Sequence, residues 1–153
     1  MKLSAESFMN RLVCQKVTSI VQESGVPLGY FFKWYLRGPY CSSLADDIYA
    51  ITSGCPISLE KWSLGEQTKA KLAEVKRLFT CLPKNNLESL GKKLELWSSI
   101  LFLNRTNQIE NNSVETLQKV LKANGKEYPD NDVREAVDLL KNHGFNLKEM
   151  CCS

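Results

Sequence analysis

The feature that most constrains this chain is the return of apolar residues at intervals of three or four positions, in stretches that end at glycine or proline. In the first stretch, about residues 3 to 23, they run from Phe8 through Val13 to Val21, with polar residues between them, and Gly25 follows. Such spacing places the apolar side chains on one face of an α-helix. Because the pattern recurs along most of the chain, it predicts a mostly helical protein.

Capping residues mark where further helices begin. Ser42 or Ser43 opens a helix through Ala50. At four later places a residue suited to an N-cap stands three positions before a glutamate, the spacing of a capping box. These pairs predict helices from Ser63 to about Leu82, from Asn85 through Leu101, from Asn112 to Ala123 and from Asp132 to Asn142.

Residues 30–36 interrupt the helical pattern with a run of aromatic side chains that favours a short strand before a Gly38–Pro39 turn, although a helix is also compatible with it. We therefore expect a mainly α fold, a single compact domain of about six helices over residues 1–153, with at most a small strand pair near residues 30–37. A winged-helix-like arrangement is one form of this fold. A flexible C-terminal tail is expected from about residue 146.

Composition sets the broad class of protein. With 43% apolar and 24% charged residues, the 153 residues have the composition of a globular domain with one hydrophobic core. No apolar run is long enough to span a bilayer, and the N-terminus lacks the apolar segment of a signal peptide. We therefore expect a cytoplasmic protein that does not bind membranes, and reduced thiols at the six cysteines.

Basic residues concentrate in residues 61–93, which hold eight lysines and arginines against three glutamates, a net charge of +5. Clustered cations supply the sequence-independent part of nucleic-acid affinity, so this region is a candidate phosphate-contacting face. A solvated helix face explains the same pattern without any ligand. The candidate residues are Lys69, Lys71, Lys76, Arg77, Lys92 and Lys93.

The aromatic run is the second candidate region. Its composition resembles a stacking platform for unpaired bases, but a core strand is the more common use of such residues. Where they stay exposed, tyrosine, tryptophan and arginine are typical anchors of protein interfaces. The candidate partner-binding residues are Trp34, Tyr35, Arg37 and Tyr40.

Enzyme chemistry has little support in the sequence. His143 is the only histidine, and its position just before Gly144 is typical of a helix end rather than of a nucleophile's general base. No paired Cys-x-x-Cys, glycine-rich phosphate loop or dinucleotide motif occurs. We therefore predict no catalytic residues, no metal site and no cofactor. An enzyme that pairs a cysteine with His143 is the weakest of the alternatives.

Three segments carry a resemblance to a known family. Residues 35–48, from Tyr35-Leu36-Arg37-Gly38-Pro39-Tyr40 to Ile48, resemble a stretch of the YwgA-like proteins of bacteria and archaea, and more distantly the Gly-Pro turn of SocA-like, or Panacea, antitoxin domains. Residues 94–103 and 133–144 are similar to two later helices of the YwgA-like group. Arg37 and Phe102 depart from its pattern. The resemblance implies a mostly helical fold without a shared catalytic constellation, and SocA-like domains act through protein contacts.

Two functions from different classes follow. The first is a non-catalytic protein-interaction or regulatory domain, antitoxin-like in character, whose protein partner the sequence does not identify. The second is a winged-helix-like nucleic-acid-binding protein that uses the basic 61–93 region. The oligomeric state is open, and a homodimer is one alternative.

Overall fold

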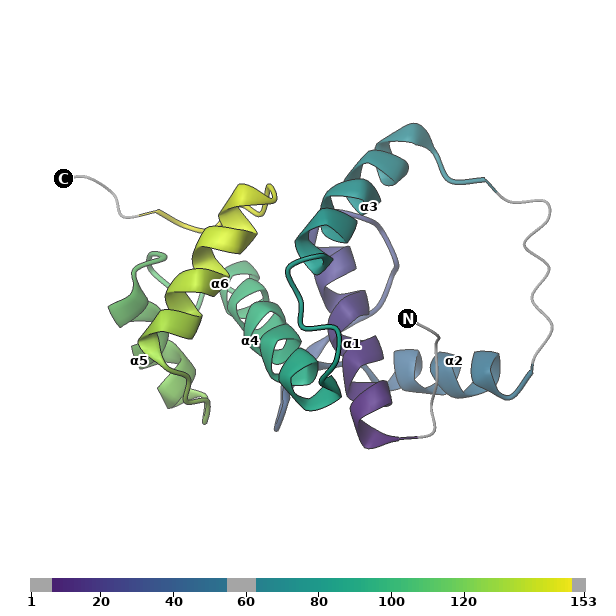
Figure 1. Ribbon diagram of the computed structural model, residues 1–153, viewed down its shortest axis with the longest axis horizontal. Helices are drawn as coiled ribbons and strands as arrows, with labels where there is room; N and C mark the ends of the chain where they lie inside the picture. The colour runs from purple at the N-terminus through teal and green to yellow at the C-terminus, as the bar shows by residue number, and fades with distance from the viewer. Residues whose placement is uncertain (1–6, 55–62, 150–153) are drawn as a thin grey trace.

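The computed structural model describes residues 7–54 and 63–149 of the chain. Over these residues six helices and one two-stranded antiparallel sheet follow one another (Figure 1), which confirms the predicted mainly helical fold with a small strand pair. In chain order the elements are α1 (Phe8–Glu23), β1 (Lys33–Tyr35), β2 (Gly38–Tyr40), α2 (Ser42–Thr52), α3 (Glu66–Phe79), α4 (Leu87–Arg105), α5 (Val114–Ala123) and α6 (Asp130–Asn142).

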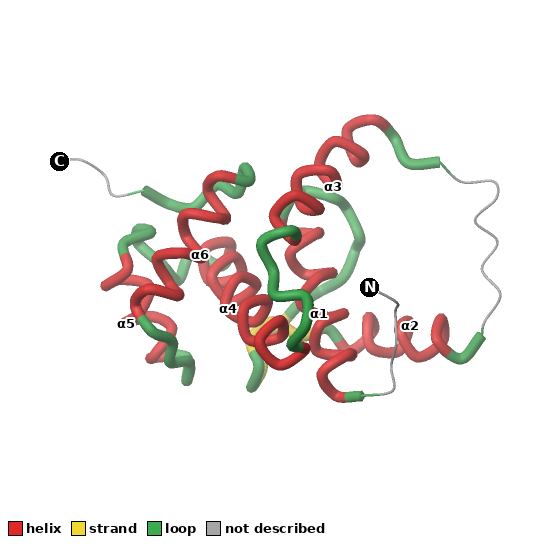
Figure 2. Tube along the Cα trace, in the orientation of Figure 1, coloured by secondary structure: helices red, strands yellow, loops and turns green. Residues whose placement is uncertain are grey.

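Helix α4 is the centre of the fold. In Figure 1 it lies between α1 on one side and α5 and α6 on the other, and it contacts all three. Its second half, from Leu94 to Leu103, is buried all round, because apolar residues and the small Ser98 and Ser99 occupy every position except Glu95. A helix that is apolar on all sides is stable only when neighbours cover every face. The strand pair packs against α4 and α1 (Figure 2).

The helices begin close to the predicted positions, but several caps differ. The side chain of Asn86, not Asn85, caps α4 by accepting from the Ser89 amide, and Ser113, not Asn112, caps α5. Two polar residues stand side by side at both places, so the local sequence does not decide which one takes the cap. The N-caps of α2, α3 and α6 are Cys41, Gly65 and Pro129, in place of the residues predicted there.

The hairpin corrects the predicted turn at Gly38 and Pro39. The turn is Leu36–Arg37, and both Gly38 and Pro39 belong to β2, where they face Tyr35 and Trp34 across the sheet. Gly38 has a φ of +75°, and a Cβ atom there would lie 2.6 Å from Ser99 Oγ of α4. Glycine is therefore required because the strand follows a tight turn and passes directly over the central helix.

The chain after α6 stays on the core for several residues. Leu147 is buried, and the Asn104 side chain bonds the Asn146 carbonyl and the Lys148 amide. The expected tail from about residue 146 thus begins with residues that contact α4, and residues 150–153, including Cys151 and Cys152, lie outside the described residues. Among the helices that the structure describes, none has the length and apolar character needed to cross a bilayer.

Candidate functional site

The two strands separate the candidate interface residues. Trp34 turns inward and is half-buried, with its ring centroid 5.8 Å from that of Phe102 in α4. Tyr35, Arg37 and Tyr40 stay exposed. Trp34 thus packs against the core from a half-buried position, whereas the other three candidates border one hollow.

That hollow, here called the hairpin groove, is bounded by the hairpin, α1 and α2 and has a volume of about 500 Å³. Most of its lining is apolar or aromatic: Phe8, Leu12, Tyr35, Leu36, Tyr40, Ala45, Ile48 and Tyr49. The charged residues in the lining are Arg11, Lys16 and Arg37, and no carboxylate of the described chain lines it. Among the residues that the structure describes, the lining of the groove therefore combines an apolar surface with basic side chains.

Apolar side chains stand in water at the rim of the groove. Leu36, at the tip of the hairpin, is 83% exposed and Tyr35 is 67% exposed. The rings of Tyr35 and Tyr40 lie 5.7 Å apart, and the guanidinium of Arg11 lies 6.0 Å from the ring centroid of Tyr49. Rigid aromatic side chains beside an apolar hollow are typical of surfaces that bind another molecule.

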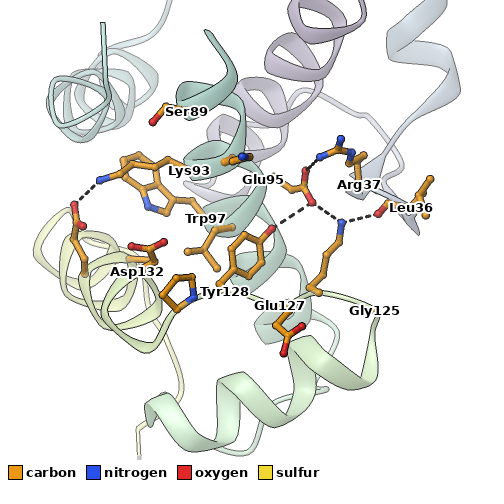
Figure 3. A pocket seen from close by; sticks show the side chains of 16 residues that line it. Leu36, Arg37, Ser89, Lys93, Glu95, Trp97, Gly125, Glu127, Tyr128 and Asp132 are labelled. Carbon is orange, nitrogen blue, oxygen red and sulfur yellow. Dashed lines mark hydrogen bonds and ion pairs between the residues drawn. The ribbon is translucent and has the colours of Figure 1, made fainter. Parts of the chain in front are cut away.

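A buried charge cluster lies directly behind the hairpin tip, centred on Glu95 of α4 (Figure 3). Lys126 and Tyr128, from the loop between α5 and α6, both donate to Glu95 Oε1, and Arg37 Nη1 lies 3.4 Å from Oε2. Lys126 also donates to the Leu36 carbonyl at 2.6 Å. The side chains of Glu95 and Lys126 are only 6% exposed. Lys126 therefore ties the hairpin tip to α4 inside the protein, because it bonds both the Leu36 carbonyl and Glu95.

Lys16 of α1 is a second buried cation beside this cluster. It is 2% exposed and donates to the Pro39 carbonyl at 2.6 Å. Burial lowers the pKa of Lys16 to about 7, because desolvation disfavours the charged amine. The charge of Glu95 opposes this shift, whereas the charges of Lys126 and Arg37 add to it.

Two further groups complete the surroundings of Glu95. Burial and the nearby Glu95 charge raise the pKa of Tyr128, so its hydroxyl remains a donor. Ser99 Oγ is buried beneath Gly38 and has no hydrogen-bond partner in the described chain. The hairpin thus passes over a polar, tightly enclosed part of α4.

A second hollow of about 670 Å³ lies on the other side of the hairpin tip, beside α4, α6 and the loop before α6 (Figure 3). Leu36 and Arg37 line both hollows. The charges of this second hollow are mixed: it includes the ion pair of Lys93 with Glu135 at 2.7 Å and the carboxylates of Glu127 and Asp132. It therefore lacks the single sign of charge found in the hairpin groove.

The candidate nucleic-acid residues do not form one unneutralised face. Four of the six pair with a glutamate: Lys69 with Glu66 at 2.7 Å, Arg77 with Glu74 at 2.9 Å, Lys92 with Glu88 at 3.0 Å and Lys93 with Glu135 at 2.7 Å. Lys71 donates to the Gly25 carbonyl at 2.8 Å, and Lys76 is exposed on α3. Local carboxylates thus compensate most of the charge that the sequence concentrates here.

The residues weighed for catalysis do not line the groove. His143 is the C-cap residue of α6, and its Nδ1 lies 3.9 Å from Glu74 Oε2. Of the described cysteines, Cys14 and Cys41 are buried and Cys81 is exposed. Within the described ranges, no group of three or more histidine, cysteine, aspartate or glutamate side chains is arranged to hold a metal ion.

The sequence interpretation missed Leu36, Lys16, Glu95 and Lys126. A signal was present for two of them, since Lys16 stands four positions from both Leu12 and Ile20 on the apolar face of α1. Glu95 likewise interrupts an apolar run. A charge at a core position must find a partner, so both residues indicated a buried polar contact. Lys126 follows Gly125 in a loop and carried no such signal.

Comparisons of the chain with protein-family models, with curated proteins and with solved structures give no match.

Proposed function

We propose that this chain is a non-catalytic protein-interaction domain that binds an apolar segment of a partner protein in the hairpin groove. The observation that carries the proposal is the groove itself, an apolar hollow of about 500 Å³ with Leu36 and Tyr35 exposed at its rim. An antitoxin-like or regulatory role is the setting that the resemblance to SocA-like domains implies.

The energetic argument concerns the exposed rim. Each Å² of apolar surface removed from water contributes roughly 25 cal/mol, and a leucine that becomes fully buried contributes about 2 kcal/mol. Leu36 and Tyr35 keep most of their surface in water in this chain. A partner that covers them gains this energy without any rearrangement of the core, because the hairpin tip is already held by Lys126.

The nucleic-acid alternative has weaker support. The cations on α3 and at the start of α4 mostly pair with carboxylates, as in Lys69 with Glu66 and Lys92 with Glu88. A phosphate would have to displace these exposed pairs or share their cations. Exposed pairs are weak, so a phosphate could still compete for these cations, and retention on heparin measures whether it does.

The proposal is tested by selecting binders from a random peptide library displayed on phage against the purified chain. We expect the recovered peptides to bind the wild-type protein and to lose about tenfold or more in affinity on Leu36→Asp, because a charge at the rim opposes burial. Phe31→Asp is the matched control, since Phe31 is 80% exposed, close to Leu36 in sequence and outside the groove.

Two outcomes contradict the proposal. One is a set of peptides that bind both variants as well as the wild-type chain, which would place binding elsewhere. The other is a library without binders combined with salt-sensitive retention on heparin that Lys69→Gln and Lys76→Gln abolish. That result would favour the nucleic-acid function of the basic region.

A further inference from the structure

Basic side chains outnumber carboxylates where the hairpin groove adjoins the cluster around Glu95. Three cations, Lys16, Arg37 and Lys126, act around a single carboxylate, Glu95. Lys126 and Tyr128 both bond Glu95 Oε1, and Arg37 reaches Oε2 only at 3.4 Å. A single carboxylate therefore serves three basic side chains, and its closest contact goes to Lys126, outside the groove.

The two cations that line the groove keep unused hydrogen-bonding capacity. The Lys16 ammonium has three donors, of which one bonds the Pro39 carbonyl, and no carboxylate of the described chain lies within ion-pair distance of it. Arg37 has a side chain that is 52% exposed, and a single long contact to Glu95 leaves most of its five donors open. Arg37 therefore presents open donors to whatever occupies the groove, and Lys16, although almost fully buried, lines its wall with donors left over.

We propose that the hairpin groove selects a partner segment in which a glutamate or aspartate stands among apolar residues, and that this carboxylate pairs with Lys16 and Arg37. The proposal rests on the proposed function of the groove and names the chemistry of its partner. An acidic side chain suits the site because it supplies the negative charge that Glu95 alone does not. A neutral segment would cover Lys16 and Arg37 without compensating them, which costs energy.

The site also predicts how binding depends on pH. The charged groups that act on Lys16 are Glu95 of α4, Lys126 of the α5–α6 loop and Arg37 of the hairpin, and Arg11 lines the groove from α1 itself. The pKa of Lys16 is lowered to about 7. A carboxylate binds the protonated amine more tightly, so affinity for an acidic segment falls as the pH rises through this value.

The experiment uses the peptides recovered from the library, each resynthesised with its acidic residue changed to the matching amide. On the wild-type chain we expect the amide peptide to bind about tenfold more weakly, the loss typical of one charge-assisted hydrogen bond. On the double variant Lys16→Met/Arg37→Gln the acidic peptide and its amide should bind equally. Lys33→Gln is the matched control, because Lys33 is an exposed cation of the same hairpin outside the groove.

A second probe reads the charge preference without any peptide. Pyrenebutyrate carries a carboxylate on an apolar body, and pyrenebutanol carries a hydroxyl on the same body. We expect the carboxylate probe to bind the wild-type chain about tenfold more tightly, with the preference lost in Lys16→Met/Arg37→Gln. The preference should also decline above about pH 7 in the wild-type chain and not in Lys16→Met.

The outcomes separate the two proposals. Peptides that are sensitive to Leu36→Asp but unaffected by the acid-to-amide change, or equal binding of the two pyrene probes, would overturn the acidic anchor and leave the protein-interaction function standing. Peptides insensitive to Leu36→Asp would overturn the function itself. In that case a carboxylate preference of the pyrene probes that depends on Lys16 and Arg37 would still support the charge selectivity of the groove.

Discussion

The hairpin groove and the basic face of α3 both present cations, and they differ in where the compensating carboxylates lie. On α3, Lys69 and Arg77 each pair with a glutamate three residues earlier in the same helix. In the groove, the nearby carboxylate for Lys16 and Arg37 is Glu95, which also bonds Lys126. Glu95 lies 79 residues after Lys16 and 58 residues after Arg37 in the chain. Counting cations along the chain therefore points to α3, where glutamates compensate the charge, and not to the hairpin groove, where fewer carboxylates lie near the cations.

The two regions also differ in what their ion pairs contribute to stability. Exposed pairs contribute about 0–1 kcal/mol, because water screens both partners and long side chains lose entropy. A buried charge left without its partner costs about 3–5 kcal/mol. The same substitution of a carboxylate by its amide should thus destabilise the protein far more at the buried cluster than at an exposed pair, and this contrast can be measured directly.

The largest effect is expected for Glu95→Gln. This change leaves Lys16, Arg37 and Lys126 around a neutral amide, and we expect the free energy of unfolding to fall by about 3–5 kcal/mol in urea titrations. Glu88→Gln on the same helix removes an exposed pair with Lys92, and we expect it to change the free energy of unfolding by about 0.5 kcal/mol or less. Equal losses in the two variants would contradict the assignment of a buried cluster.

The second effect is the pH dependence of stability due to Lys16. Its pKa is near 10.5 when unfolded and about 7 when folded, so between these values unfolding takes up a proton and the Lys16 contribution to stability rises with pH. The unfolding free energy of the wild-type chain minus that of Lys16→Met should increase by up to about 1.4 kcal/mol per pH unit. Parallel pH profiles for the two proteins would show that Lys16 does not titrate in this range.

The third effect concerns the fit of the hairpin on α4. Gly38→Ala places a Cβ 2.6 Å from Ser99 Oγ at a positive φ, and the combined strain should cost about 2–4 kcal/mol. Gly29→Ala is the control, because Gly29 also has a positive φ, of +80°, but its Cβ would meet nothing within 4 Å. If the two variants melt at the same temperature, the close passage of β2 over α4 does not contribute to stability.

The smallest effect is expected on α3. Replacing Lys69, Lys71, Lys76 and Arg77 by glutamine should change the unfolding free energy by less than about 1 kcal/mol and leave peptide binding to the groove unaltered. On heparin, the wild-type chain should elute below about 0.15 M salt, because local carboxylates reduce its attraction for sulfates. If heparin strongly retains the wild-type chain but not the four-glutamine variant, nucleic-acid binding becomes the better supported of the two candidate functions.

The helices were predictable because their signal is local. Apolar residues three and four positions apart face the same side whatever the rest of the chain does, so α1 follows from spacing alone. The turn of the hairpin was not predictable in the same way. A glycine followed by a proline is typical of a turn, but Gly38 is needed here because Ser99, 61 residues later, lies against it.

The candidate site was predictable only in part, for a related reason. The turn lies at Leu36–Arg37 and not at the predicted Gly38–Pro39, and its position sets which side chains of the hairpin face inward. A change of register would exchange the inward and the exposed positions. Trp34 consequently packs against Phe102, and Leu36 projects into water. Lys16 and Glu95 each stood out within an apolar pattern, but no local signal indicates that distant charges meet.

The bridge made by Lys126 has a consequence for synthesis of the chain. Its ammonium bonds the Leu36 carbonyl, 90 residues earlier, and the Glu95 carboxylate, 31 residues earlier. A nascent chain grows from its N-terminus, so the hairpin emerges from the ribosome long before the side chain that fastens its tip. Until Lys126 has been added and released, Leu36 and Tyr35 stand on a hairpin whose tip is not yet fastened, and the exposed rim is most open to aggregation during this interval.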